Sequence, residues 1–260
     1  MDWLYTLSGF LVGLIVGVTG VGGGSLMTPL LVLFFGVSPA TAVGTDLLYA
    51  SITKSLGGWV HGRNGTVDWK VVGLLGTGSL PAALLTIGLF KFLALDEAAL
   101  KGLVTGVLSI ALLLTAAALL LKEWIKKIAL RDDGTVYELH HRHLPGATVA
   151  TGAIVGVLVT ISSIGAGVLG TVALLFLYPR MATAKVVGTD IAHAVPLTAV
   201  AGLGHLALGT VDLVLLGSLL LGSLPGIYIG SHLSAKVPEK VLRPILAVML
   251  MLIGGKLMVS

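Results

Sequence analysis

Two short segments of the chain combine clustered glycines with hydroxyl side chains, a composition that suits the binding of a small anion. They lie at residues 17–25 and 162–167. Glycine lets the backbone unwind and approach a ligand closely. A helix that begins after such a break points its free N–H groups and its partial positive charge at the gap. The candidate anion-binding residues are Gly22, Gly23, Gly24, Ser25, Thr28, Ser162, Ser163, Gly165, Gly167 and Thr171.

Three ionisable side chains, Asp46, Lys54 and Asp190, lie within otherwise apolar stretches. Charged groups inside a membrane are costly and commonly functional. The aspartates could carry protons or cations, or could orient the glycine-rich segments through hydrogen bonds. The alternative is that each aspartate caps the N-terminus of its helix. Lys54 follows Asp46 by eight residues, so both can share a helix face, where Lys54 either attracts an anion or neutralises an aspartate.

The histidines offer weaker signals. His193, one turn after Asp190, could relay protons, or it is a packed neutral side chain. His61 and His205 stand at the ends of predicted spans, which is typical of interfacial anchoring. Without cysteines or a second cluster, three histidines of the polar segment favour a solvated linker over a metal site: His140, His141 and His143. The sequence therefore predicts no metal site and no cofactor.

The composition places these groups in a membrane. Of the 260 residues, 56% are hydrophobic and 11% are charged, whereas a soluble domain has about 45–50% and about 25%. The mean hydropathy is +1.04, and a soluble fold of this size cannot bury so much apolar surface. These values exclude a soluble globular enzyme and a disordered chain. The net charge of +4 is interpreted as a topology signal rather than as a nucleic-acid surface.

Apolar stretches long enough to be membrane segments are predicted at 4–19, 21–36, 40–61, 69–91, 98–121, 146–163, 165–179, 184–205, 211–232 and 240–259. The chain begins without an early Lys or Arg, so its first stretch is interpreted as a span rather than a signal peptide. The second and seventh stretches are short and each follows a glycine-rich break. They are therefore predicted to be half-helices.

The two halves of the chain repeat each other. Three motifs recur at an offset of 144 residues. They are VGTD at 43–46 and 187–190, GTVD at 65–68 and 209–212, and GSLP at 78–81 and 222–225. The predicted organisation is a first repeat (1–121), a cytoplasmic polar linker (122–145) and a second repeat (146–260). The predicted fold class is all-α, a polytopic membrane protein of about ten segments in two five-segment repeats.

An odd number of segments per repeat inserts the two halves in opposite orientations, and the loop charges agree with this. Twelve of the sixteen Lys and Arg residues fall in the odd-numbered loops, which the positive-inside rule places in the cytoplasm. Both termini are then expected outside the inner cell membrane. Equivalent loops also differ in charge, since Arg63 and Lys70 correspond to Ala207 and Val214. A parallel repeat with unrelated loop charges is the alternative.

The motif order resembles that of the TauE/SafE family of membrane transporters. The resemblance rests on GVGGGSLMTPLL (20–31), AVGTD (42–46) and HGRNGTVDW (61–69), together with the second-half segment GSLPGIYIGSHL (222–233). It covers nearly the whole chain outside the 122–145 linker. The resemblance implies export of sulfite, sulfonates or related sulfur-containing or organic anions, with the glycine-rich segment as the family's hallmark.

The first hypothesis is therefore a secondary transporter that exports a small anion by alternating access around a glycine-rich site near the midplane. An inside-negative potential could drive this export without coupling, or the aspartates could couple it to protons. An importer or channel for a similar anion is the alternative, and an intramembrane aspartyl enzyme is a more distant one. The expected partners are the anion and the lipid bilayer, without nucleic acid. A homodimer remains open, because the Gly102–Gly106 face can pack within or between monomers.

Overall fold

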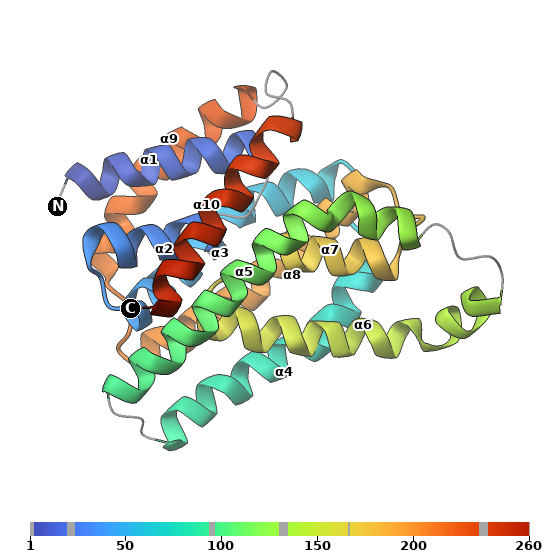
Figure 1. The fold of residues 1–260 in the computed structure, drawn as a ribbon, viewed down its shortest axis with the longest axis horizontal. Helices are drawn as coiled ribbons and strands as arrows, with labels where there is room; N and C mark the ends of the chain where they lie inside the picture. The colour runs from blue at the N-terminus through green and yellow to red at the C-terminus, as the bar shows by residue number, and fades with distance from the viewer. Residues whose placement is uncertain are drawn as a thin grey trace.

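The computed structural model describes residues 3–19, 24–93, 97–129, 135–165, 167–233 and 239–259. These ranges consist of helices joined by short turns, and they contain no strand (Figure 1). The first five helices are α1 (Trp3–Thr19), α2 (Gly24–Phe35), α3 (Pro39–Arg63), α4 (Trp69–Leu93) and α5 (Glu97–Ala129). The following helices are α6 (Thr135–Ser162), α7 (Val168–Leu177), α8 (Thr183–Ala207), α9 (Leu213–Leu233) and α10 (Glu239–Val259).

The lengths of the helices agree with a polytopic membrane protein that contains broken segments. In the described part of the chain, five stretches are long and apolar enough to cross a membrane: Trp69–Leu93, Ala98–Trp124, His143–Ser162, Thr183–Ala207 and Leu213–Gly230. The helices α2 and α7 have only 12 and 10 residues. At about 1.5 Å per residue they are too short to cross a hydrocarbon core of about 30 Å. The prediction that the second and seventh segments are half-length is therefore confirmed.

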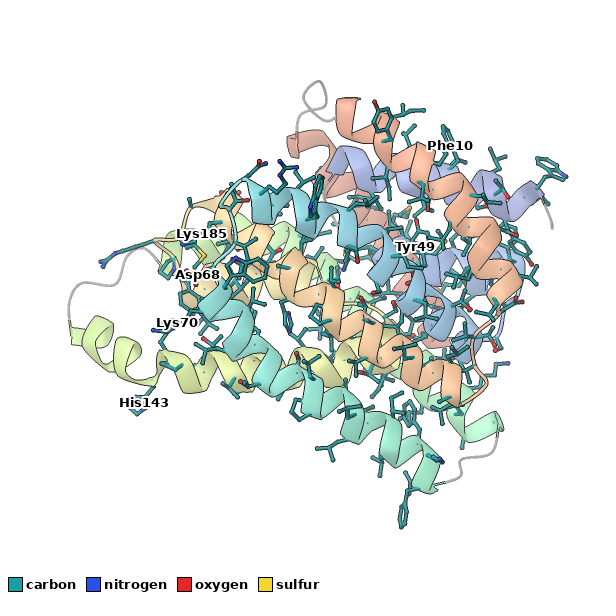
Figure 2. The ribbon with its side chains drawn as sticks, turned by 180° about the vertical axis from the view of Figure 1, so that it is seen from behind. Phe10, Tyr49, Asp68, Lys70, His143 and Lys185 are labelled. Carbon is teal, nitrogen blue, oxygen red and sulfur yellow. The ribbon has the colours of Figure 1, made fainter. Side chains whose placement is uncertain are left out.

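Helix extends further into the polar connection than hydropathy indicates. The helix α5 continues to Ala129 and α6 begins at Thr135, so most of residues 122–145 are helical rather than an open loop. Hydropathy marks where apolar side chains end, and a helix continues past that point when its backbone hydrogen bonds remain satisfied. His143 is exposed on α6, far from the bundle centre (Figure 2). The side chains of His140 and His141 lie outside the described set.

The starts of α3 and α8 correct one interpretation of the aspartates. Ser38 caps α3, because its Oγ accepts a hydrogen bond from the Thr41 N–H at 3.2 Å and Pro39 follows at the first helical position. Helix α8 begins at Thr183. Asp46 and Asp190 thus both lie about two turns inside their helices, so the interpretation of these residues as N-terminal caps is wrong.

The main helix pairs each join an element from before the polar connection to one from after it. Helix α1 packs along α9, α4 along α6, α3 along α8 and α5 along α10 (Figure 1). Under the sequence offset, the α1–α9 and α4–α6 pairs are equivalent to each other. The two halves are therefore interleaved, with α3 and α8 between the two equivalent pairs.

Glycines set the close approach within these equivalent pairs. Gly222 of α9 lies against the backbone of Thr6 and Phe10, and its counterpart Gly78 of α4 lies against the backbone of Val149 and Ala153. A Cβ at either glycine would overlap these backbone atoms. Such contacts are typical of small residues between membrane helices. The packing interpretation is thus correct for these glycines.

The Gly102–Gly106 pair behaves differently. A Cβ added at either residue would meet no described atom of another element within 4 Å. This pair therefore does not pack against another helix within the described part of the monomer.

Alanine at the close contacts should destabilise the protein. We expect Gly222→Ala and Gly78→Ala to lower the free energy of unfolding by about 1–3 kcal/mol, because a rigid backbone must move. Gly217→Ala, on α9 with open space at its Cβ, should be neutral or stabilising by up to about 1 kcal/mol through helix propensity. Thermal unfolding in detergent measures all three. Equal midpoints for Gly222→Ala and Gly217→Ala would contradict the close packing.

Candidate functional site

Helices α3 and α8 cross at residues that correspond to each other in the repeat. The Ser51 Oγ donates to the Val195 carbonyl oxygen at 3.4 Å, and these two positions are 144 residues apart. Gly44 near the start of α3 packs on His205 near the end of α8, and Gly188 near the start of α8 packs on His61 near the end of α3. The two helices are therefore antiparallel, and an approximate twofold axis passes near Ser51.

The repeated VGTD and GTVD motifs dock onto each other across this axis. The Asp68 N–H donates to Thr189 Oγ1 at 2.9 Å, and the equivalent Asp212 N–H donates to Thr45 Oγ1 at 3.0 Å. We call these the two docking contacts. Each joins the turn before one helix of a half to the long central helix of the other half, so neither half completes them alone.

The glycine of each VGTD motif makes room for its docking contact. A Cβ at Gly188 would overlap the Thr66 carbonyl oxygen, and a Cβ at Gly44 would overlap the Thr210 carbonyl oxygen. The turns themselves are held by histidines, since His61 Nδ1 lies 2.8 Å from Thr66 Oγ1 and His205 Nδ1 lies 2.8 Å from Thr210 Oγ1.

His205 is not an interfacial anchor. Its side chain is 1% exposed, and its Nε2 lies 2.9 Å from the Thr160 carbonyl oxygen. The anchoring interpretation assumed that a span end faces the headgroups. At this position the turn after α8 is instead covered by α6 and by the docking contact.

The aspartates of the VGTD motifs bind the two half-helices. Thr28 of α2 donates to Asp46 Oδ2 at 2.6 Å, and Thr171 of α7 donates to Asp190 Oδ2 at 3.1 Å. All four side chains are at most 9% exposed. Each central helix thus positions one half-helix through a buried charge-assisted hydrogen bond. That the aspartates orient the glycine-rich segments stays a prediction.

Four buried polar atoms in the described part of this centre have no hydrogen-bond partner: Asp46 Oδ1, Asp190 Oδ1, Tyr49 Oη and Ser163 Oγ. Ser163 lies beside Asp46, and Tyr49 lies beside Ser223. Buried polar groups are normally satisfied, and exceptions commonly mark a ligand or water position. Tyr49 lies inside the bundle (Figure 2).

Lys54 breaks the symmetry of the centre. It lies on α3, to one side of the crossing with α8, and it is partly buried. It interacts electrostatically with Asp190 and, more weakly, with Asp46. Its repeat equivalent is Thr198, which donates to a carbonyl oxygen of its own helix at 2.8 Å. Both aspartates therefore lie within electrostatic range of Lys54.

His193 belongs to the wall of this centre. It is 1% exposed, and its Nε2 lies 2.8 Å from Ser79 Oγ on α4. A buried ring bonded to one hydroxyl fits the packed neutral interpretation, and the ring also interacts electrostatically with Lys54.

The backbone between α6 and α7 is broken at the predicted segment. Ser163, Gly165 and Gly167 have φ of 58°, 117° and 151°, all in the region that favours glycine. Ser162 Oγ donates to the Leu158 carbonyl oxygen at 2.6 Å and accepts from the Ile164 N–H at 3.2 Å, so it terminates α6. Ser163 is left with a buried hydroxyl and lies beside Asp46.

The equivalent break before α2 is only partly described. Gly24 opens α2, whereas Gly22 and Gly23 lie outside the described residues and so does the side chain of Ser25. The hydroxyls of Thr28 and Thr171, expected as anion donors, donate to the aspartates instead.

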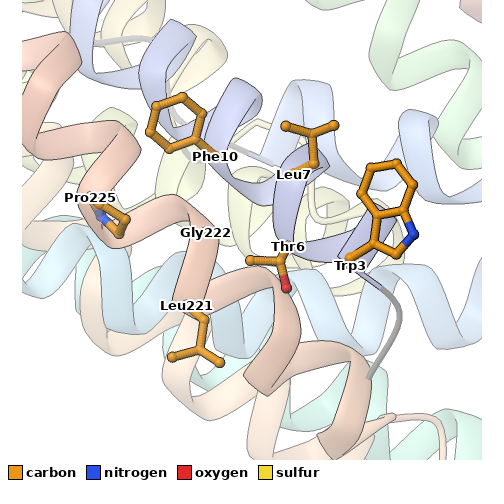
Figure 3. A pocket seen from close by; sticks show the side chains of 7 residues that line it. All are labelled: Trp3, Thr6, Leu7, Phe10, Leu221, Gly222 and Pro225. Atoms are coloured by element: carbon orange, nitrogen blue, oxygen red, sulfur yellow. The ribbon is translucent and has the colours of Figure 1, made fainter.

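An apolar groove of about 550 Å³ lies elsewhere, on the outer face of α1 and α9 (Figure 3). It is lined by Trp3, Thr6, Leu7, Phe10, Leu221, Gly222 and Pro225. Several of its side chains, Trp3 and Leu221 among them, are exposed as large hydrophobic groups. This lining suits contact with lipid chains and offers little that would hold a small anion.

One docking contact carries an ion pair and the other does not. Lys185 Nζ lies 3.2 Å from Asp68 Oδ2 at one end of the molecule (Figure 2). Burial acts to raise the pKa of Asp68, but the Lys185 ammonium and the Val71 N–H outweigh it and hold the pKa below its usual value. The equivalent positions are Asp212 and Thr41, which cannot form an ion pair.

The pH dependence of this ion pair follows from the lowered pKa. A carboxyl group whose pKa is lower in the folded protein stabilises the fold at pH values above its unfolded pKa of about 4. This contribution is lost as the pH falls through the pKa of the folded protein. We expect Lys185→Met to cost at most about 1 kcal/mol at pH 7, since both side chains are partly exposed. The difference from wild type should shrink as the pH falls below about 4 and disappear below the pKa of the folded protein. Unfolding midpoints between pH 2 and 8 measure it, and a difference that stays constant over this whole range would contradict the assignment.

Comparison with known proteins agrees with this architecture. The family model described as "Sulfite exporter TauE/SafE" matches residues 5–257. A relative from Bacillus subtilis, the "Probable membrane transporter protein YjnA", is 38% identical over 251 residues, covering 96% of this chain and 97% of its own length. The "Probable membrane transporter protein YdhB" of the same organism is 28% identical, covering 90% and 91%.

An archaeal relative extends the match. The "Probable membrane transporter protein MJ0441" of Methanocaldococcus jannaschii is 28% identical, covering 97% of this chain and 92% of its own length. No solved structure matches the chain. The chain belongs to the TauE/SafE family, and it is a multi-pass membrane transporter rather than an enzyme.

Proposed function

We propose that the protein is a secondary transporter that exports small sulfur-containing or organic anions, such as sulfite or sulfonates, by alternating access around its two broken segments. The observation that carries this proposal is the break between α6 and α7, where a half-helix begins beside a buried, unpartnered Ser163 hydroxyl. The relation to a family described by sulfite export supports the substrate class.

The described residues would act on an anion in distinct ways. The N-terminus of α7 contributes partial positive charge, the Ser163 hydroxyl can donate to an anion oxygen, and Lys54 supplies a positive charge nearby. Asp46 and Asp190 would not contact the anion, since they hold the half-helices through Thr28 and Thr171. Movement of a half-helix against its central helix would then open the site to one side at a time.

Opposite orientation of the two halves is part of this proposal. The odd number of segments per repeat does not support it, because α2 and α7 are too short to cross the membrane. The antiparallel crossing of α3 and α8 supports it, because repeat-equivalent residues meet there. The contact between Asp68 and Lys185 supports the assigned sides, because both residues lie in loops that the charge pattern assigns to the cytoplasm. The termini would then lie outside the inner membrane, and the linker with His140, His141 and His143 would be cytoplasmic.

Transport in proteoliposomes tests the proposal. Sulfite, sulfate, thiosulfate, an alkanesulfonate and acetate are presented to the reconstituted full chain, and the flux of each is measured. We expect flux of at least one sulfur-containing anion, lowered at least 10-fold by Ser163→Ala, which corresponds to about 1.4 kcal/mol. Ser218→Ala is the matched control, since Ser218 is buried and donates only to its own helix at 2.9 Å. No flux of any of these anions would overturn the proposal.

Carrier and channel mechanisms give different results in the same vesicles. Unlabelled anion on the far side should accelerate uptake of labelled anion, because only a carrier returns loaded. Absence of this acceleration at measurable flux would favour a channel. Vesicles with defined orientation and voltage then distinguish exporter from importer.

A further inference from the structure

We infer that Asp46 binds a monovalent cation, a proton or Na⁺, at the position bounded by its free Oδ1 and the Ser163 hydroxyl, and that this bound cation strengthens binding of the anion. The second part of the inference rests on the proposed function. The first part concerns the protein without a bound anion, and it rests on separate observations.

The first observation is geometric. Asp46 Oδ2 already accepts a hydrogen bond from Thr28, whereas Asp46 Oδ1 and Ser163 Oγ have no hydrogen-bond partner, and Ser163 lies beside the Asp46 carboxyl group. Asp46 is 0% exposed and Ser163 is 3% exposed. An unpaired carboxylate oxygen in such a place leaves its desolvation uncompensated, and a proton or a small cation between the two oxygens removes this cost. Oxygen ligands of this kind suit hard cations.

The second observation is a count of charges. Among the described residues of this centre the groups that carry charge are Asp46, Asp190 and Lys54, which leaves a net charge of −1. His193 and His205 bond to hydroxyl and carbonyl groups and need no charge to do so. The Asp212 N–H donates to Thr45 Oγ1. The Asp212 carboxylate accepts from the N–H groups of Val214 and Leu215, away from Asp46. A buried net charge is costly, and one monovalent cation cancels it.

The third observation decides between the two aspartates. Lys54 interacts more strongly with Asp190 than with Asp46, so Asp190 already has a counter-charge. Asp190 Oδ1 also lies against Gly170, at the place that a Cβ of this residue would occupy, so the glycine covers one side of this oxygen. Asp46 therefore takes the cation.

Coupling to the anion follows from the same count. An anion that enters beside Ser163 adds negative charge to a centre that is already at −1. Its binding is strongly favoured when the cation is present, because opposite charges in a medium of low dielectric attract. A bound cation should thus raise the affinity of the centre for the anion.

Cation binding is measured without any candidate anion. The purified full chain in nanodiscs is titrated with Na⁺ against choline at a constant chloride concentration, and separately with protons from pH 4 to 9, while the unfolding midpoint is recorded. Current on a solid-supported membrane after a Na⁺ or H⁺ jump gives a second readout. We expect a saturable response to one of the two cations, and the responding arm identifies it.

Two charge-neutralising variants should have opposite effects. Asp46→Asn should abolish the response, because Asp190 and Lys54 alone are neutral. Lys54→Met should raise cation affinity at least 10-fold, because the centre then stands at −2. Ser163→Ala should lower the affinity severalfold, and it serves where Asp46→Asn does not fold. Thr198→Ser, at the repeat equivalent of Lys54, should change nothing.

The outcomes separate the two proposals. No response in the wild type, or an unchanged response in Asp46→Asn, overturns the cation site. Equal losses in Asp46→Asn and Lys54→Met indicate a structural role and also overturn it. A cation response without flux of any sulfur-containing anion leaves the site standing and rejects the proposed substrate instead. Anion flux that is insensitive to the concentrations of both cations rejects the linkage between cation and anion.

Discussion

Replacing Gly188 by alanine should destabilise the protein by about 3 kcal/mol or more, and Gly44→Ala should do the same. At either position the added methyl group would overlap a backbone carbonyl oxygen of the opposing turn, that of Thr66 or Thr210. To accommodate the methyl group, the turn must move away from the central helix, and this movement also breaks the hydrogen bond of Thr189 or Thr45. Both the packing loss and the hydrogen-bond loss lower the free energy of unfolding.

Matched glycines on α3 serve as controls. A Cβ at Gly57 or Gly58 would lie 3.6 or 3.7 Å from the nearest side-chain atom, an ordinary contact. Gly57→Ala and Gly58→Ala should therefore leave stability unchanged or raise it by up to about 1 kcal/mol. Unfolding midpoints and the monodisperse fraction in detergent measure all four variants. If Gly44→Ala were as stable as Gly57→Ala, the docking contact would not be close-packed as described.

Replacing Thr28 by valine should reduce transport at least 10-fold, and Thr171→Val should act similarly. Valine keeps the shape of threonine but removes the side-chain hydrogen bond that each buried carboxylate accepts from its half-helix. Leaving a buried charged acceptor unpaired costs about 1–3 kcal/mol or more, and about 1.4 kcal/mol corresponds to a factor of ten. The half-helix is then no longer held to its central helix, so both the site and its movement are affected.

Serine at the same positions provides the control, because it keeps the hydroxyl. Thr28→Ser should retain flux within about threefold, which corresponds to less than 1 kcal/mol. Flux is followed with whichever anion the proteoliposome screen identifies. Thr28→Val and Thr28→Ser with the same flux would show that the hydroxyl, and so the link between α2 and Asp46, has no part in transport.

Sequence reasoning gives the helices well but their partners poorly. The predicted segment at 69–91 is observed as Trp69–Leu93, and the short stretch at 21–36 as Gly24–Phe35. These boundaries follow from hydropathy and from glycine and proline, which are local signals. The contact between Asp68 and Thr189 forms only in the packed structure. The sequence repeat indicates that both motifs are important, but not that they contact each other. The nearest signal in the sequence is the recurrence of the motifs in the same order in both halves.

The roles of single residues show the same limit. Ser38 rather than Asp46 caps α3, because the helix begins earlier than the motif indicates. Ser162 and Thr28 have the hydroxyls expected of anion ligands, yet their protons go to a carbonyl and a carboxylate. Tyr49 was missed altogether, since a tyrosine in an apolar segment looks like ordinary core. Only its partnerless hydroxyl distinguishes it.

The interleaving of the two halves sets an order on biosynthesis. Helix α1 is made first, but its packing partner α9 begins at Leu213, near the end of the chain. During synthesis, the face of α1 that contacts the glycines of α9 stays exposed to lipid until about four-fifths of the protein has been translated. Folding of the first half is therefore completed only after translation of the second, so the nascent chain is most exposed to mispairing and proteolysis in this interval.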